Sequence, residues 1–145
     1  MMKRYSFLLA MMLLIKALIA PASAADKAWA DCVQETDPDL GIAGCTRVLL
    51  RGTQETARSR AIAYYNRGVS YRAKGEDDRA IADYNDAIRL DPKYAHAYHN
   101  RGNVYYAKGE HDRAIADYNE AIRLDPRDAI AYNNRGTTYN AKGER

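Results

Sequence analysis

Two cysteines, Cys32 and Cys45, are the first candidates for chemistry in this sequence. Twelve residues separate them, which excludes a CxxC redox motif. A metal site needs three or four converging ligands, and no ligand cluster accompanies the pair. The even cysteine count favours a structural disulfide between Cys32 and Cys45, and two buried free thiols are the alternative.

The three histidines do not supply a metal site or an active site either. His96 and His99 share one face of an expected helix, and His111 lies in the next turn region. The sequence has no glycine-rich phosphate loop, no nucleophile elbow and no HExxH motif. Its acidic residues recur regularly, as solvated helix starts and arginine partners do. We therefore expect no catalytic residue, no metal, no cofactor and no enzymatic activity.

Residues 1–24 have the pattern of a secretory signal peptide. Lys3 and Arg4 precede the apolar run Phe7–Ile15, and the small residues Ala22–Ala24 form a cleavage site. Cleavage after Ala25 fits nearly as well, and an uncleaved membrane anchor is the alternative. We expect an exported bacterial protein, periplasmic or secreted, with no membrane span after cleavage. Export to an oxidising compartment favours the disulfide.

The charge balance argues against nucleic acid as a partner. The sequence has 22 basic and 19 acidic residues, and three of the basic ones, Lys3, Arg4 and Lys16, lie in the signal peptide. Cleavage leaves equal numbers of both signs, so no basic field remains to attract phosphates.

The stretch 61–145 repeats itself with a period of 34 residues. Two full copies occupy 61–94 and 95–128, and a partial copy occupies 129–145. Gly68, Gly102 and Gly136 mark the same position in each copy. A fixed period of this length is typical of a solenoid, in which each unit packs mainly on its neighbours.

Each copy contains the pattern of two helices. Tyr64, Gly68 and Tyr71 follow the spacing of one helical stripe, and Gly75 then interrupts the helix. Pro92 ends the second helix, because proline cannot donate the backbone hydrogen bond of a helix interior. The stripe of the second helix consists of Ala80, Tyr84 and Ala87.

These residues resemble the tetratricopeptide repeat (TPR) family. The second copy carries the same motif at Tyr98, Gly102, Tyr105, Ala114, Tyr118, Ala121 and Pro126, and the third carries Tyr132, Gly136 and Tyr139. The resemblance implies an all-α, right-handed solenoid of antiparallel helix pairs. One departure is an arginine where the family often has leucine, at Arg67, Arg101 and Arg135. A half-buried arginine needs a partner, and we expect Asp83 and Asp117 to pair with the first two.

Residues 25–58 read as a diverged hairpin of the same kind. Aligned with the first good repeat, Cys32 falls at the position of Tyr71 and Cys45 at that of Tyr84. Both cysteines then face the inside of one hairpin. About five extra residues around Gly52–Ser59 are expected to lengthen the link to Ala61.

The resemblance also implies a groove lined by the first helix of each repeat. Asn66, Asn100 and Asn134 form a ladder in it, and an amide both donates and accepts hydrogen bonds with a peptide backbone. A ladder without a ligand is the alternative. Arg72 is the one full positive charge, so we do not expect capture of a terminal carboxylate. The groove residues are expected to be Tyr65, Asn66, Val69, Arg72, His96, His99, Asn100, Asn103, Tyr106, Asn133, Asn134, Thr137 and Asn140.

The function that follows is non-catalytic binding of a protein or peptide. A self-assembling repeat protein of the cell envelope, or a regulatory subunit or fragment of an envelope enzyme, are the alternatives. The last helix keeps its inward stripe without a second helix after it, so its edge is a candidate surface for self-association. Its polar residues Asn133, Asn134, Thr137, Thr138 and Asn140 are expected to make up a partial cap.

Overall fold

The computed structural model describes residues 24–143, so the expected signal peptide lies outside the described residues except for Ala24. All the regular elements in the described range are helical. In chain order they are α2 (Ala24–Val33), α3 (Pro38–Leu49), the 3-10 helix η1 (Gly52–Gln54), α4 (Ala57–Ala73), α5 (Asp77–Leu90), α6 (Ala95–Ala107), α7 (His111–Leu124) and α8 (Ala129–Lys142). None of the helices in this range is long and apolar enough to span a membrane.

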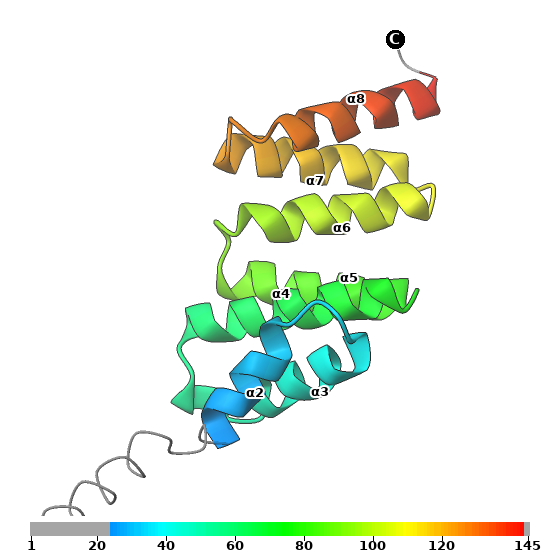
Figure 1. The fold of residues 1–145 in the computed structure, drawn as a ribbon. Helices are drawn as coiled ribbons and strands as arrows, with labels where there is room; N and C mark the ends of the chain where they lie inside the picture. The colour runs from blue at the N-terminus through cyan, green and yellow to red at the C-terminus, as the bar shows by residue number, and fades with distance from the viewer. Residues whose placement is uncertain (1–23, 144–145) are drawn as a thin grey trace, which may run out of the picture.

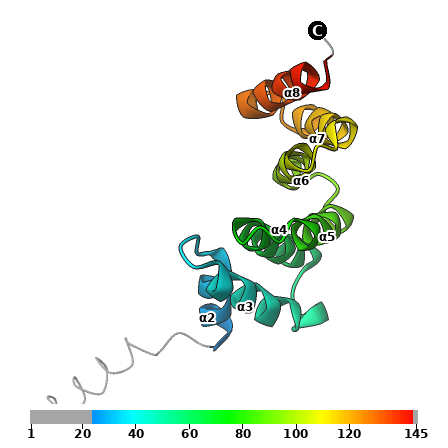
Figure 2. The same ribbon diagram turned by 90° about the vertical axis from the view of Figure 1, so that its right-hand side faces the viewer.

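The helices form three hairpins and a single last helix, stacked in chain order (Figure 1). The hairpins are α2–α3, α4–α5 and α6–α7, and α8 packs on α7. Seen along the helices, α4, α6 and α8 follow one side of the stack, and α5 and α7 follow the other (Figure 2). The expected all-α solenoid of helix pairs is confirmed.

Turn chemistry sets the ends of the helices. Gly75 and Gly109 have φ of 75°, a left-handed conformation that suits glycine, and each lies between the two helices of a hairpin. The second helices end just before the Asp-Pro pairs that begin at Asp91 and Asp125. Because the same signals recur, α5 and α7 have the same length, 14 residues each.

Helix α4 begins earlier than the repeat boundary at Ala61. The Thr56 side chain caps the helix by accepting a hydrogen bond of 3.0 Å from the Ser59 amide, so α4 starts at Ala57. The extra residues of the link therefore lie partly in η1 and partly in the first turn of α4.

A contact between a glycine and a tyrosine sets the spacing of each good hairpin. A Cβ added to Gly68 would lie 2.8 Å from the Tyr84 ring, and one added to Gly102 would lie 2.9 Å from the Tyr118 ring. Both tyrosines are fully buried. The two helices are thus as close as they are because the first one lacks a side chain at this point.

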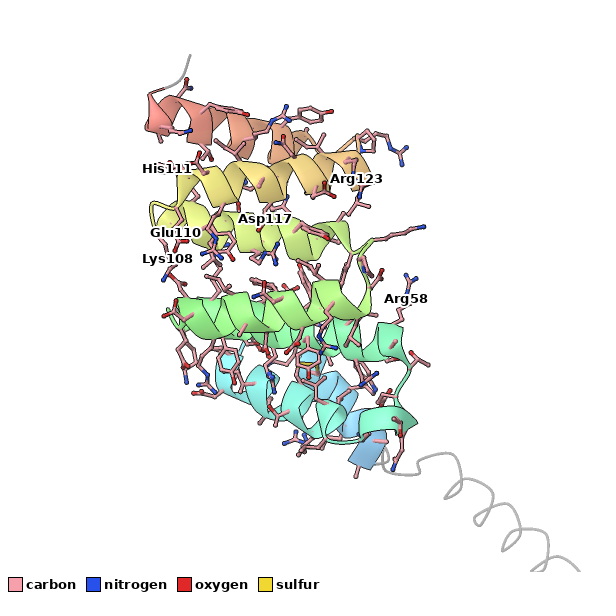
Figure 3. All side chains as sticks on the ribbon, turned by 180° about the vertical axis from the view of Figure 1, so that it is seen from behind. Arg58, Lys108, Glu110, His111, Asp117 and Arg123 are labelled. Carbon is pink, nitrogen blue, oxygen red and sulfur yellow. A yellow bond between two sulfur atoms is a disulfide. The ribbon has the colours of Figure 1, made fainter. Side chains whose placement is uncertain are left out.

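The arginines that depart from the family pattern connect three helices. Arg67 donates two hydrogen bonds of 2.8 Å to Asp83, and Arg101 donates bonds of 2.8 and 2.6 Å to Asp117. Both expected pairs are confirmed, and Figure 3 shows Asp117 on the side of α7 that faces α6. The same guanidinium groups also reach the preceding hairpin, since Arg67 donates to Thr46 and Arg101 to Asn85.

A disulfide joins the first hairpin, as predicted. The sulfur atoms of Cys32 and Cys45 are 2.09 Å apart, and their Cα atoms are 4.4 Å apart. Gly44 permits this approach of α3 to α2, because a Cβ there would lie 2.5 Å from the Cys32 amide nitrogen. Closing a loop of this size is worth about 3 kcal/mol in the chain-entropy account of disulfides.

Helix α8 differs from α4 and α6 at the equivalent positions. Gly136 is exposed and has no atom within 4 Å of an added Cβ, whereas Gly68 and Gly102 are buried against tyrosines. Ile130 is 64% exposed and Tyr132 is 44% exposed. The expectation that Thr138 belongs to a polar outer face is wrong, because its side chain is fully buried and bonds the Asn134 carbonyl.

Substitution of the spacing glycine should destabilise the array. We expect Gly102→Leu to lower the free energy of unfolding by about 1–3 kcal/mol or more, because the leucine overpacks the contact with Tyr118. Gly136→Leu is the matched control, since the same position in α8 is open and should tolerate the side chain. Thermal and denaturant unfolding measure both. Equal effects at the two positions would contradict the assigned role of the glycine.

The Arg101–Asp117 pair should show strong energetic coupling. Burial raises the pKa of the paired Asp83 despite the hydrogen bonds from Arg67, which indicates how costly such a buried carboxylate is. We therefore expect Arg101→Met to cost more stability than the double variant with Asp117→Leu, with a coupling energy of about 1 kcal/mol or more. A double-mutant cycle measures it, with Arg135→Met as a control at an arginine that bonds Asn119 instead. If the cost of the double variant equals the sum of the two single costs, the residues are not coupled.

Candidate functional site

Two hollows lie on the side of the stack formed by the first helices, and we name them hollow 1 and hollow 2. Hollow 1 has a volume of about 380 Å³ and lies between α4, Asn100 of α6 and the α2–α3 link. It is lined by Cys32, Val33, Gln34, Glu35, Pro38, Tyr65, Asn66, Val69, Ser70, Ala73 and Asn100.

Hollow 2 lies nearer to α8. Its volume is about 330 Å³, and α4, α6, α7 and α8 all contribute to it. It is lined by Arg72, Asn103, Tyr106, Ala107, Tyr118, Asn134 and Thr137. Since α4 and α6 border both hollows, the two hollows lie along one face of the solenoid.

Most of the predicted groove residues line these hollows. Hollow 1 contains Tyr65, Asn66, Val69 and Asn100, and the other predicted residues that line a hollow belong to hollow 2: Arg72, Asn103, Tyr106, Asn134 and Thr137. Four predicted residues line neither of them: His96, His99, Asn133 and Asn140.

The repeat pattern did not predict some of the residues that line the hollows. Gln34 and Glu35 come from the link between α2 and α3, and Pro38 is the first residue of α3; all three lie outside the 34-residue period. Tyr118 comes from a second helix, where the pattern predicts core packing. It does both, because its ring packs on Gly102 while its hydroxyl group lies at hollow 2.

The asparagine ladder is bonded between repeats. The Asn100 side-chain amide donates to the Tyr65 hydroxyl at 2.9 Å, and that of Asn134 donates to Asn103 Oδ1 at 2.9 Å. These bonds join α4 to α6 and α6 to α8. They hold the side chains in place through the Nδ2 groups and leave the side-chain Oδ1 atoms of Asn100 and Asn134 to accept hydrogen bonds from a ligand.

Tyr65 also takes part in packing, which the sequence pattern did not assign to it. Its ring centroid lies 6.0 Å from that of Tyr84 and 5.0 Å from that of Tyr94. Burial raises the pKa of Tyr65, and it raises that of Tyr94 to about 12, so both phenols stay neutral at ordinary pH. The ring is therefore a fixed, apolar wall of hollow 1 with one polar atom.

The two core tyrosines differ in how their hydroxyl groups are satisfied. Tyr118 donates to Asn103 Oδ1 at 2.8 Å, whereas the equivalent position in the preceding repeat is Val69. The Tyr84 hydroxyl group accordingly has no hydrogen-bond partner within residues 24–143. Burial raises the pKa of both, to about 12 for Tyr118.

His99 has a structural partner at the junction of α6 and α8. Its Nδ1 lies 2.9 Å from Asp128 Oδ2, while Asp128 Oδ1 accepts the amides of Ile130 and Ala131 and caps α8. His96 is exposed on the first turn of α6. In the described range no group of three His, Cys, Asp or Glu residues is placed to hold a metal ion.

The lysines at the ends of the first helices are used in links between repeats. Lys74 pairs with Asp39, Lys108 with Asp78, and Lys142 with Asp112, at distances of 2.5 to 2.8 Å. The Lys108 side of the stack is seen in Figure 3 beside Glu110 and His111. Arg72 differs, because it is half-buried at hollow 2 and its side chain makes no hydrogen bond or ion pair with any residue of the range 24–143.

The fold defines a class of protein, a helical repeat solenoid with two hollows along the side of its first helices. The TPR repeat family matches residues 68–109 and 102–143, which together make up more than half of the chain. The chain therefore belongs to the TPR repeat family.

Two solved structures of MamA are similar to this chain. One is 34% identical with a TM-score of 0.66, and it covers 73% of this chain and 55% of the MamA chain. The other is 30% identical with a TM-score of 0.70, and it covers 88% and 74%. The present chain thus spans about half the length of the first MamA chain. No curated protein sequence matches.

A third similar structure is the first TPR domain of Spaghetti (RPAP3), bound to the HSP90 peptide SRMEEVD. Its TM-score is 0.71 at 21% identity, covering 86% of this chain and 100% of that domain. At this identity the likeness shows the fold alone.

Loss of the Asp128 cap should loosen α8. Burial by itself would raise the pKa of Asp128, but hydrogen bonds from Ala131 and His99 outweigh it and lower the pKa below 3.8. We expect Asp128→Ala to cost about 1 kcal/mol. A lowered pKa gives stability that is present above 3.8 and lost as the pH falls through the folded value.

The measurement is unfolding at neutral pH and at a pH well below the lowered pKa. The cost of Asp128→Ala should shrink at the low pH, and Asp128→Asn, which keeps a capping side chain, should cost less at neutral pH. The exposed Arg127→Ala serves as the control. A cost of Asp128→Ala that is the same at both pH values would contradict the role of the charged cap.

Proposed function

We propose that this chain binds an extended segment of a partner protein along hollows 1 and 2, without catalysis. The observation that carries the proposal is the pair of hollows on one face, lined by residues from α4, α6 and α8. Pockets that combine apolar walls with a few convergent polar groups are the usual form of binding sites.

The fixed side chains of the groove support this function. Asn100 and Asn134 are held by hydrogen bonds to neighbouring helices, so their carbonyl oxygens need no ordering before a peptide amide donates to them. Tyr65 gives an apolar wall and Arg72 a charge. The peptide held by the similar RPAP3 domain is a further support for a peptide ligand, and its sequence is that domain's own.

Export is part of the same proposal. The bonded pair Cys32 and Cys45 supports an oxidising compartment, because structural disulfides persist there and are rare in the cytosol. We therefore place the partner in the bacterial periplasm or outside the cell.

The test is selection of short linear peptides from a random display library on the full chain. Ala73 is exposed and lines hollow 1, while Ala116 is exposed on α7. We expect Ala73→Trp to abolish binding of the selected peptides, because the ring fills the hollow, and Ala116→Trp to leave it intact. Unchanged melting temperatures show that both variants fold. Failure to select any peptide, or equal loss in both variants, would overturn the proposal.

Self-association through α8 is a second candidate. Tyr132 and Gly136 are exposed, whereas the equivalent Tyr98 and Gly102 of α6 meet the second helix α7. Ile130, in the first turn of α8, adds exposed apolar surface. We expect the sedimentation coefficient to rise with concentration, and Tyr132→Lys to suppress the rise. A monomer at every concentration would exclude this candidate.

A further inference from the structure

Arg72 differs from the arginines that pair with carboxylates at the helix interfaces. Arg67 and Arg101 are half-buried and each binds a carboxylate of its own hairpin. Arg51 is half-buried and binds Glu55. Arg72 and Arg60 are also partly buried, and neither side chain has such a partner in the described range; of the two, Arg72 lines hollow 2. The position of Arg72 in the next repeats is taken by Tyr106 and Asn140. The chain therefore presents this guanidinium once, at hollow 2.

Arg72 lines hollow 2 from α4. Its charge lowers the pKa of both Tyr84 and Tyr118 against the larger effect of burial. It therefore sits between the first and second repeats, where α4, α6 and α7 meet. A half-buried arginine without a counter-charge is costly unless a ligand supplies one.

The neighbouring polar groups of hollow 2 are arranged as donors. Asn103 Oδ1 already accepts two hydrogen bonds, from the Tyr118 hydroxyl and from the Asn134 amide. These bonds orient the Asn103 side chain so that its own NH₂ group stays available. The Thr137 hydroxyl lines the same hollow. Asn134 Oδ1 is the acceptor that remains, suited to a peptide N–H.

We infer that hollow 2 binds an acidic side chain, aspartate or glutamate, of the partner segment, with Arg72 as its counter-charge and the Asn103 amide as an additional donor. The inference rests on the proposed function and names the chemistry of its partner. The groove extends from Arg72 toward Tyr65 in hollow 1 and toward Thr137 in hollow 2, so a segment that fills it passes Arg72. The carboxylate is therefore that of a side chain within the segment.

The test uses the same display library on three proteins: the wild-type chain, Arg72→Gln and Arg58→Gln. Arg58 is an exposed arginine in the first turn of α4, at the end opposite to Lys108, Glu110 and His111 (Figure 3). We expect one position of the peptides selected on the wild type and on Arg58→Gln to be enriched in Asp or Glu. The enrichment should vanish on Arg72→Gln.

Affinity measurements on one selected peptide complete the test. Replacement of its acidic residue by the amide should weaken binding to the wild type about tenfold or more, and should have little effect on binding to Arg72→Gln. The melting temperature of Arg72→Gln should equal or exceed that of the wild type, because the Arg72 side chain makes no bond in the described range and the costly unpaired charge is removed.

The possible results separate the two proposals. Selected peptides without an enriched acid, or equal binding of the acid and amide forms, would overturn the inference and leave groove binding in place. If amidation of the peptide's C-terminus removes binding while the side-chain change does not, a terminal carboxylate is the ligand and the inference is wrong. The absence of any selected peptide would overturn both.

Discussion

The close contact of a glycine with a tyrosine ring is the constraint on which the rest of this structure depends. Gly68 meets Tyr84 and Gly102 meets Tyr118, so each pair of helices approaches to the distance set by one ring. At that distance the arginine beside each glycine reaches an aspartate on the facing helix. A larger residue would push the helices apart and would separate the ion pair together with the core.

The paired arginines also connect each hairpin to the preceding one. Each guanidinium group bonds its own hairpin twice and the preceding hairpin once, through Thr46 or Asn85. The charge is costly to bury, yet all three of its nitrogen atoms donate hydrogen bonds, which favours one relative position of three helices over alternatives. These contacts fix the spacing of α4, α6 and α8 along the groove. At that spacing the Asn100 and Asn134 side chains can bond to the preceding first helix.

The residues that recur in each repeat make the contacts between helices. The residues that differ between repeats determine the chemistry of the groove. The position of Val69 becomes Asn103 and Thr137 in the next copies, and that of Arg72 becomes Tyr106. These changes put the apolar Val69 in hollow 1, and Asn103, Thr137 and the guanidinium-bearing Arg72 in hollow 2. Glu35, from the α2–α3 link, adds a carboxylate to hollow 1. The groove is thus uneven along its length although the helices around it are nearly identical, because the scaffold contacts lie on a different face of each helix.

The sequence by itself determined the helices, their order, the disulfide and the arginine–aspartate pairs. A 34-residue period, the turn glycines and the Asp-Pro ends act locally, so they can be read without coordinates, and the cysteine and arginine partners followed from the repeat register. Only the tertiary structure decided which groove positions share a hollow. His99 pairs with Asp128, Thr138 is buried, and Glu35 of the α2–α3 link and Pro38 at the start of α3 line hollow 1. The physical reason is that these placements depend on how separate hairpins pack, and the repeat register carries no information about partners outside its own period.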